Sequence, residues 1–347
     1  MRSRHARLVR RSEQYTMWKY AAVAAASRAF SLNSSTRWVY RRLGNVALTR
    51  MRVADGLPER YVDRARRLLA ACETNRILRP GDAVLELGTG WVHWEALVLR
   101  LFHDVEITLY DVWDNRLFTA FRCYADQLDD HLDDLGEELG FDPARVRTAH
   151  ERLGAARSAR TFDELYDTLG MRYVVEPSGM LEELPESHYA LVVSADVLEH
   201  VDAATLPAYL ARTTALLRPG GWSLHQIDLV DHFHYFDPSC SPKHFYRYDT
   251  ATWRRRWDSS VQYVNRVQRP EWLDLFEAAG LQLRREERVS EPMGDVPLAG
   301  AFRGLAQEDV DCLQTILLHR RPEPAVPHQG TSTENPAAAT IAPASRH

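Results

Sequence analysis

The chain has 347 residues, of which 45% are hydrophobic and 26% charged, and its formal net charge is −5. This composition is that of a globular protein and excludes a collagen-like chain, a disulfide scaffold or wholesale disorder. At about 150 residues per domain, the length allows two domains or one enlarged α/β domain. The sequence contains no run of about 18 uncharged apolar residues, so we expect no membrane-spanning helix.

The basic residues are concentrated near the N-terminus. Residues 1–60 contain 13 Lys or Arg and three Asp or Glu, so a net charge of +10 there leaves −15 for the other 287 residues. Such an arm can pack on the acidic body as a solvated helical segment, or it can attract anionic lipid. We favour the packed helical segment, with peripheral contact to anionic lipid as the alternative. We expect no nucleic-acid binding, because no RNA-binding module accompanies the arginine run 254–256.

The cysteines are far apart in the sequence and form no CxxC pair. They are Cys72, Cys123, Cys240 and Cys312. This usage fits a reducing compartment and excludes a zinc ribbon, so we expect a cytoplasmic protein.

The chain divides into three expected regions. Residues 1–75 form a basic helical region, in which Tyr61–Thr74 places its apolar residues on one helical face. Through residues 76–321, short β-rich runs alternate with helical stretches, which predicts a parallel sheet covered on both faces. The expected strands are Ala83–Leu87, Glu106–Tyr110, Tyr173–Val175, Ala190–Ser194, Trp222–Asp228, Leu281–Val289 and Cys312–His319. Residues 322–347 hold five prolines and no apolar period, which predicts a disordered tail.

The interval between the second and third expected strands is too long for a single crossover helix. Within it, leucines recur at helical spacing from Leu128 to Leu139 among acidic residues. This pattern is typical of an amphipathic helix with a solvated acidic face. We therefore expect a helical insertion at about 113–170.

A glycine turn follows the first expected strand, in the string DAVLELGTG (82–90). Gly88 and Gly90 lack a Cβ where the backbone must turn tightly and approach a ligand. A dinucleotide-binding turn would have a third glycine at position 93, where this chain has His93. The carboxylate of Glu86 would also repel a phosphate. The turn therefore favours a cationic ligand.

Four strings in this order resemble the class I S-adenosylmethionine-dependent methyltransferases. They are VLELGTG (84–90), ITLYD (107–111), YALVVSADVLEHV (189–201) and LLRPGGW (216–222). The resemblance implies an α/β, Rossmann-like, doubly wound sheet of seven strands in the order 3-2-1-4-5-7-6, with the last strand antiparallel. It also implies that S-adenosylmethionine is the cofactor. The implied contacts are Glu86, Gly88, Thr89, Gly90, Asp196 and, at the ribose hydroxyls, Asp111.

Two positions depart from the family pattern. Trp91 replaces the small residue that commonly follows the second glycine. Gly179-Met180 stands where a Gly-Asp pair often meets the adenine. The adenine contact is therefore left open, with Glu176 and Glu182 as the nearby acids.

Two groups of polar residues are candidates for activating an acceptor hydroxyl. Asp228, Asp231 and His232 follow the fifth expected strand, and His232 suits a general base because imidazole takes up a proton near neutral pH. If DVLEH (196–200) is helical, Asp196, Glu199 and His200 share one face and could bind a divalent metal. This string resembles the ExxEH of some metal-dependent O-methyltransferases, in which a residue after the fifth strand completes the metal site. Asp196 is shorter than the first glutamate of that pattern, so we favour the base over the metal. His200 is a further catalytic candidate.

The stretch 225–257 also holds eight aromatic residues, whose faces can stack on a sugar or a planar ring. The sequence thus predicts a cytoplasmic S-adenosylmethionine-dependent O-methyltransferase for a small-molecule or glycan-type hydroxyl. One alternative is a catalytically inactive methyltransferase-like scaffold that binds partners through the basic arm and the insertion. A nicotinamide-dependent oxidoreductase is the third interpretation.

Overall fold

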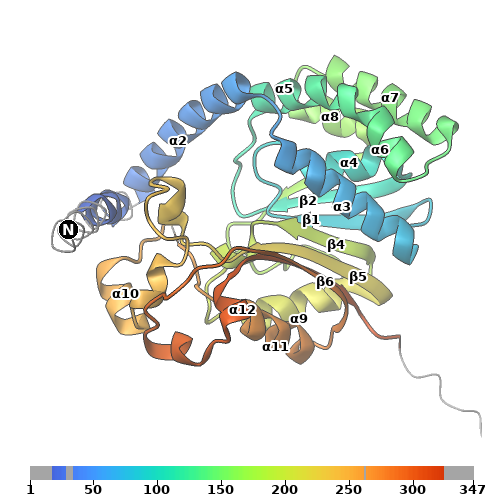
Figure 1. The fold of residues 1–347 in the computed structure, drawn as a ribbon. Coiled ribbons are helices and arrows are strands. Elements are labelled where there is room, and N and C mark those ends of the chain that lie inside the picture. The colour runs from blue at the N-terminus through green and yellow to red at the C-terminus, as the bar shows by residue number, and fades with distance from the viewer. Residues whose placement is uncertain (1–17, 29–33, 262, 324–347) are drawn as a thin grey trace, which may run out of the picture.

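The structure is a computed structural model that describes residues 18–28, 34–261 and 263–323. The first 17 residues of the basic arm and residues 324–347 of the expected tail lie outside this range. Two helices occupy the described part of the arm, namely residues 18–28 and α2 (Ser34–Asp55). Figure 1 shows α2 running from α5 to the segment 18–28 near α10. No helix in the described residues is long and apolar enough to cross a membrane.

Seven strands form one sheet in the order β3-β2-β1-β4-β5-β7-β6, as predicted. Their bounds are β1 Asp82–Leu87, β2 Val105–Asp111, β3 Met171–Val175, β4 Tyr189–Ala195, β5 Leu217–Asp228, β6 Gln282–Ser290 and β7 Cys312–Arg320. β7 is antiparallel to both of its neighbours, and the other pairs are parallel. The α/β, Rossmann-like fold class is therefore confirmed.

Helices cover both faces of this sheet, which is why β1 and β4 are apolar on both sides (Figure 1). One face packs against α3 (Glu59–Asn75), α4 (Trp94–Phe102), α5 (Phe118–Leu128), α6 (Leu132–Glu138), α7 (Pro143–Ser158) and α8 (Phe162–Leu169). The other face packs against α9 (Leu206–Leu216) and α11 (Arg269–Ala278). Successive side chains of β1 enter opposite cores, with Val84 on the first face and Leu85 on the second.

The interval between β2 and β3 contains α5 to α8. A 3₁₀ turn, Asp129–His131, interrupts the expected continuous helix after α5. The leucine face is buried, whereas acids of the other face pair with α7, where His150 contacts Asp129 at 2.9 Å and Asp133 at 3.1 Å. The spacing of leucines and acids within 128–139 could not show these ion pairs, because their other partner lies on α7, a different helix.

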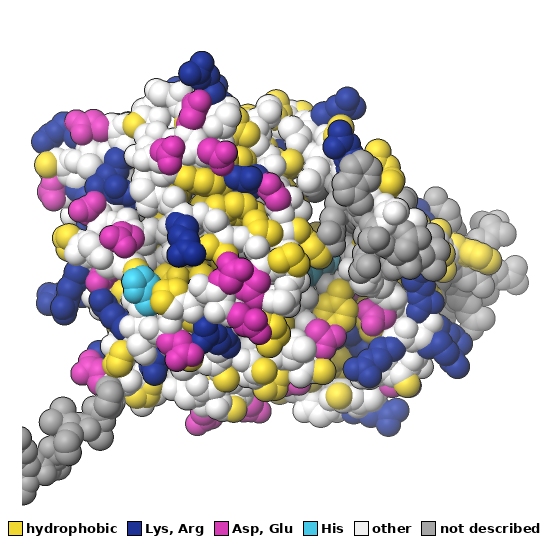
Figure 2. Space-filling model, turned by 180° about the vertical axis from the view of Figure 1, so that it is seen from behind, with side chains coloured by type: hydrophobic (Ala, Val, Ile, Leu, Met, Phe, Trp, Pro, Cys, Tyr) yellow, Lys and Arg dark blue, Asp and Glu magenta, His cyan; other side chains and the backbone are white. Residues whose placement is uncertain are grey.

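β5 begins five residues before the expected strand. Tyr189 pairs with Leu217 and Leu191 pairs with Trp222, so residues 218–221 form a bulge inside the pairing with β4. Gly221 is needed in this bulge because a Cβ there would lie 3.0 Å from the Tyr189 carbonyl oxygen. Beyond β5, the chain forms short 3₁₀ turns and α10 (Thr250–Arg256) before α11. Figure 2 shows charges of both signs over the body and basic side chains gathered near α10, where Arg254, Arg255 and Arg256 are exposed.

Candidate active site

The glycine turn after β1 needs glycine for both conformation and space. Gly88 and Gly90 have φ angles of +61° and +63°. A Cβ on Gly88 would lie 2.5 Å from a methyl group of Val197, in the loop after β4. The N–H groups of Gly88 and Thr89 both donate to the Tyr110 carbonyl, at 2.8 and 3.3 Å. The turn is thereby held against the end of β2.

Asp111 lies beside this turn at the end of β2. Its carboxylate accepts hydrogen bonds from the N–H of Val112 at 2.7 Å and of Gly90 at 3.2 Å. The side chain is buried, and burial raises its pKa to about 6. A carboxylate held in this way keeps lone pairs that can accept from ligand hydroxyls.

Glu86 is enclosed within the sheet. Its carboxylate accepts a hydrogen bond from the Ala96 N–H at 2.7 Å and so caps the start of α4. Burial, together with the nearby Glu95, raises the pKa of Glu86 well above its usual range. In the structure, Glu86 fixes the start of α4 to β1 through this hydrogen bond. Direct contact of Glu86 with the cofactor stays a prediction.

His93 adopts a left-handed backbone conformation, with φ at +49°. Its ring is buried, pairs with the Thr89 hydroxyl, and lies 2.7 Å from the Tyr166 hydroxyl of α8. Burial lowers the pKa of His93 to about 3, so the ring is neutral. The ring therefore points into the core beneath α8.

The loop after β3 adjoins Asp111. The Glu176 N–H donates to the Asp111 carbonyl at 3.0 Å. The Glu176 carboxylate accepts from its own loop, from the Ser178 hydroxyl and, at 3.1 Å, from the Met180 N–H. Glu182 is exposed on the same loop. Glu176 thus shapes the loop that faces Asp111, and the adenine contact itself stays open.

The segment after β4 does not form the helix that would place Asp196, Glu199 and His200 on one face. Asp196 has a φ of +57°, and only the single 3₁₀ turn Leu198–His200 follows before α9. The Asp196 carboxylate lies 3.4 Å from Arg64 and accepts from the Gln226 side chain at 3.1 Å. The expected grouping was therefore wrong, because a left-handed residue starts the turn and directs this carboxylate toward α3.

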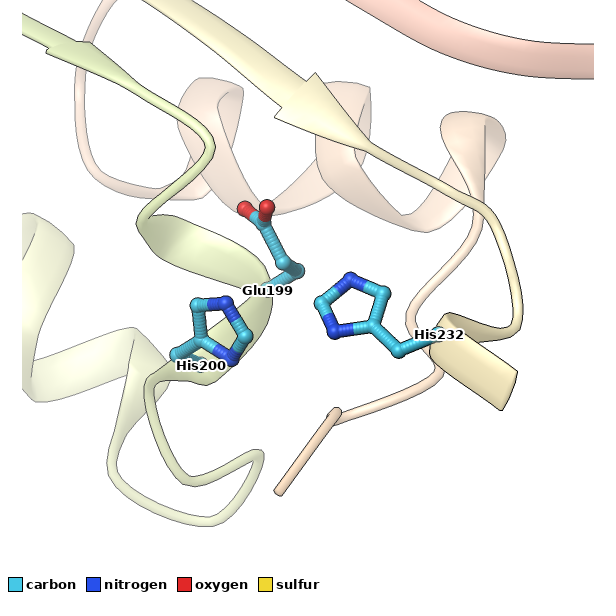
Figure 3. Close-up of side chains that lie close together, drawn as sticks. All are labelled: Glu199, His200 and His232. Atoms are coloured by element: carbon cyan, nitrogen blue, oxygen red, sulfur yellow. The ribbon is translucent and has the colours of Figure 1, made fainter. Parts of the chain in front are cut away.

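His232 takes the place expected for Asp196. One ligand-type atom from each of Glu199, His200 and His232 lies within 4.8 Å of the others. Figure 3 shows Glu199 and His200 on the turn after β4 and His232 facing them from the segment after β5. Glu199 is 1% exposed, and neither carboxylate oxygen has a hydrogen-bond partner among the described residues. Burial, with Asp196 and Asp228 nearby, raises its pKa well above the usual range.

Asp228 orients His232. Its carboxylate oxygen lies 3.3 Å from His232 Nε2 and accepts from the Tyr235 hydroxyl at 2.6 Å. Although burial raises the pKa of Asp228, its contacts with His232 and Tyr235 hold the net value below the usual range. His200 is oriented separately, because its Nδ1 lies 2.8 Å from the Tyr263 carbonyl. A carbonyl only accepts, so Nδ1 carries the proton and Nε2 keeps its lone pair.

Asp231 points elsewhere. Its carboxylate accepts from the Tyr20 hydroxyl at 3.1 Å and from the Phe233 N–H at 3.0 Å. Burial raises the pKa of Asp231 to about 6. Of the three candidates after β5, Asp228 and His232 thus join Glu199 and His200, whereas Asp231 anchors the N-terminal segment. No sequence signal pointed to Tyr20 or Tyr263, whereas Tyr235 is one of the eight aromatic residues of the stretch 225–257.

A family model described as a methyltransferase domain matches residues 56–286. The chain belongs to this methyltransferase family. The match confirms the predicted membership of the class I S-adenosylmethionine-dependent superfamily, and S-adenosylmethionine as the cofactor. No curated protein matches the sequence.

Several solved structures are also similar to this methyltransferase. One is an S-adenosylmethionine-dependent methyltransferase from Methanosarcina mazei, with 12% identity, a TM-score of 0.41 and coverage of 72% of this chain and 97% of that one. Another is 1,6-didemethyltoxoflavin-N1-methyltransferase from Burkholderia thailandensis, with 16% identity, a TM-score of 0.39 and coverage of 75% and 79%. Phosphoethanolamine N-methyltransferase 2 from Haemonchus contortus has 12% identity, a TM-score of 0.41 and coverage of 74% and 52%. Because the sequence identities and TM-scores of these structures are low, the family assignment rests on the family model alone.

The residues of the methyltransferase fit its cofactor at the glycine turn. Gly88 and Gly90 leave out the side chains that would fill the turn, and Asp111 supplies an acceptor for hydroxyl groups beside it. Thr89 and Glu86 are buried around the turn, and Asp196 lies across from it on the loop that carries Val197. The contacts of these residues with the cofactor are predictions.

Proposed function

We propose that this enzyme transfers the methyl group to a hydroxyl oxygen of a small-molecule or glycan-type acceptor, and that it does so in the cytoplasm. The observation that carries the proposal is the pairing of Asp228 with His232 beside Glu199 and His200. These residues follow β4 and β5, at the same edge of the parallel strands as the glycine turn of β1. Ligands of open α/β sheets bind at this edge. All four cysteines are free thiols, which fits a reducing compartment.

The bound cofactor supplies a methyl group that is attached to a sulfonium. After transfer of this methyl group, the sulfur remains as a neutral thioether, which is the leaving group. The acceptor must therefore lose its hydroxyl proton as its oxygen forms the new C–O bond. Asp228 lies 3.3 Å from Nε2 of His232 and would favour the imidazole proton on that nitrogen, so that Nδ1 would take the hydroxyl proton. The products are the methyl ether, the thioether and a protonated His232, which then releases its proton to solvent.

A divalent cation is a second candidate for activating the hydroxyl. The unpartnered carboxylate of Glu199 favours it, because a buried carboxylate and two imidazoles form a ligand set that suits transition metals. The set would be Glu199, His200 and His232, not the predicted Asp196, Glu199 and His200. A metal bound there would lower the pKa of a coordinated hydroxyl, and His232 would then be a ligand and not the base.

The test is methyl transfer from a labelled donor to a cell extract, followed by untargeted mass spectrometry. We expect a labelled O-methyl product with the native enzyme and none with Gly88→Val, which blocks the turn. Repeating the assay after chelation separates the two activation routes, because only the metal route loses activity. Donor binding with no labelled product would favour the inactive scaffold, and labelled N- or C-methyl products would contradict the hydroxyl acceptor. Calorimetry with NAD(H) tests the oxidoreductase interpretation, for which we expect no binding.

We also propose that α2 contacts an anionic membrane surface. Several of its described apolar side chains are exposed, at 62% for Leu43, 49% for Val46 and 43% for Val53, and Arg50 is exposed beside them. An apolar face with basic neighbours is typical of helices that lie in the headgroup region. Vesicle sedimentation tests this. Phosphatidylglycerol vesicles should retain the native protein but not Leu43→Glu, while Ala155→Glu on the exposed face of α7 should bind as the native protein does. Equal binding of Leu43→Glu would contradict the proposal.

A further inference from the structure

A pocket that is partly open to solvent lies between the helical segment 18–28 and the chain that follows β5. Its walls are mainly aromatic, and the rings are Tyr20, Phe233, Phe236, Phe245, Trp253 and Trp257. Because the pocket is open on one side, a flat ring can lie against this lining without being fully enclosed.

The segment 18–28 is fastened over this pocket at three points. Tyr20 donates to Asp231 at 3.1 Å, Lys19 lies 3.0 Å from Asp237, and the guanidinium of Arg28 donates to the Asp258 carbonyl at 3.1 Å. The Tyr20 ring is 3% exposed and packs on Phe233, with ring centroids 4.2 Å apart. The N-terminal segment thus forms one wall of the pocket.

The opposite wall is stiffened by a buried arginine. Arg266 adopts a φ of +65° and donates to the Phe245 carbonyl at 3.1 Å. Its guanidinium lies 4.7 Å from the Trp253 ring and 5.5 Å from the Phe245 ring. Both aromatic side chains are therefore held in place before any ligand enters, which reduces the entropy lost on binding.

The charge and polarity of the lining residues indicate which class of ligand the pocket can bind. None of the described lining residues is Lys or Arg, so the pocket has no cation to pair with a phosphate or carboxylate group. The polar groups at the pocket include Asp231, His232, Ser27 and Ser259. They also include the indole N–H of Trp257, which has no hydrogen-bond partner among the described residues. His232 also faces Glu199 and His200, so the pocket meets the proposed reaction centre at this residue.

We propose that this pocket holds the methyl acceptor, and that the acceptor is a neutral molecule with a planar aromatic ring next to the methylated hydroxyl. The inference rests on the proposed function for the methylation step. Apolar contact with the aromatic lining, in which Phe236 is 57% exposed, would supply most of the affinity. His232 would meet the hydroxyl, and the Trp257 N–H would be available to a second acceptor atom on the ligand.

The experiment is calorimetric titration of the full chain, with S-adenosylhomocysteine present, against three probes. 2-Naphthol has the planar ring and the hydroxyl, decahydro-2-naphthol has the hydroxyl without planarity, and 2-naphthyl phosphate has the ring with a charge. We expect 2-naphthol to bind at least about tenfold more tightly than either of the others. Equal or tighter binding of decahydro-2-naphthol or 2-naphthyl phosphate would overturn the proposed ligand class.

Two substitutions on one helix locate the binding. Ala24 lines the pocket and Ala26 is exposed on the same segment, so Ala24→Trp should fill the pocket and weaken 2-naphthol at least about tenfold, while Ala26→Trp should have no effect. Phe236→Ala, at a ring that is 57% exposed, removes one wall without filling the pocket and should weaken binding about threefold or more. Unchanged binding in Ala24→Trp and Phe236→Ala would overturn the site. Naphthol binding without methyl transfer to any hydroxyl would instead reject the proposed function and leave the pocket in place.

Discussion

The cofactor turn and the proposed acceptor end are assembled over very different distances along the chain. At the turn, Glu86 and its partner Ala96 are 10 residues apart, and Gly90 and Asp111 are 21 apart. At the acceptor end, His200 and Tyr263 are 63 residues apart, and Tyr20 and Asp231 are 211 apart. A short βαβ unit therefore builds the first site, whereas the second forms only when four separate segments meet.

The two sites should also respond differently to substitution. Changes at the turn should act on donor affinity and leave the acceptor end intact. Changes around His232 should act on turnover and leave donor affinity intact. A variant that altered both together would show that the sites are coupled.

The largest effect is expected at His232. His232→Ala removes the group that faces Asp228 and Glu199, so turnover should fall by about 10²–10⁴-fold with donor affinity nearly constant. The matched control is His234→Ala. That ring, two residues after His232, contacts the Cys240 carbonyl and does not join the cluster. Steady-state kinetics with any identified acceptor measures both. Equal losses in the two variants would mean that the segment is disturbed as a whole.

A smaller loss, but one of donor binding, is expected at the glycine turn. Gly88→Val places a side chain where Val197 already lies and forces a β-branched residue into a left-handed conformation. Overpacking costs about 1–3 kcal/mol and the conformation about 1–2 kcal/mol, so donor affinity should fall by about 10²-fold or more. Gly154→Ala is the control, since a Cβ there meets nothing within 4 Å. If calorimetry showed that Gly88→Val binds the methyl donor with native affinity, the cofactor would have to bind at a site other than the glycine turn.

Asp111 should contribute less than the turn itself. Asp111→Ala loses one charge-assisted hydrogen-bond acceptor, so donor affinity should fall by about 1–3 kcal/mol. Because burial raises the pKa of Asp111 to about 6, the carboxylate is ionised above that pH and neutral below it. Native affinity should therefore decline as the pH falls through about 6. Asp111→Asn, which cannot ionise, should bind weakly at every pH, and a native-like pH profile in that variant would assign the titration to another group.

The smallest effect is expected at the C-terminus. Arg321 donates to the Thr214 and Ala215 carbonyls, both at 3.2 Å, and Arg320 pairs with Glu323 at 2.7 Å, so a truncation that spares the fold starts after Glu323. Residues 324–347 are rich in Pro and Ala and have no apolar period. Removing them should change the melting temperature by less than about 1 °C and leave donor affinity unchanged. A drop of several degrees in calorimetry would show that these residues pack on the body.

The sequence predicted the strands and the glycine turn because both are encoded locally, whereas the strand order was implied by the resemblance to the methyltransferases. ALVVS (190–194) is apolar throughout, as a strand covered on both faces must be, and it forms the centre of β4. Gly88, Gly90 and Asp111 stand at positions that the backbone of one βαβ unit brings together. Periodicity and glycine placement act over a few residues, so they can be recognised without knowing the rest of the fold.

The tertiary structure alone decided which polar residues meet at the acceptor end. Asp196 and Glu199 are three residues apart and would share a helical face, but the left-handed backbone of Asp196 separates them. His232 joins Glu199 instead because β4 and β5 are neighbours in the sheet. Tyr20 reaches Asp231 from the opposite end of the chain. Contacts of this kind depend on how whole elements pack, and no local pattern in the sequence records them.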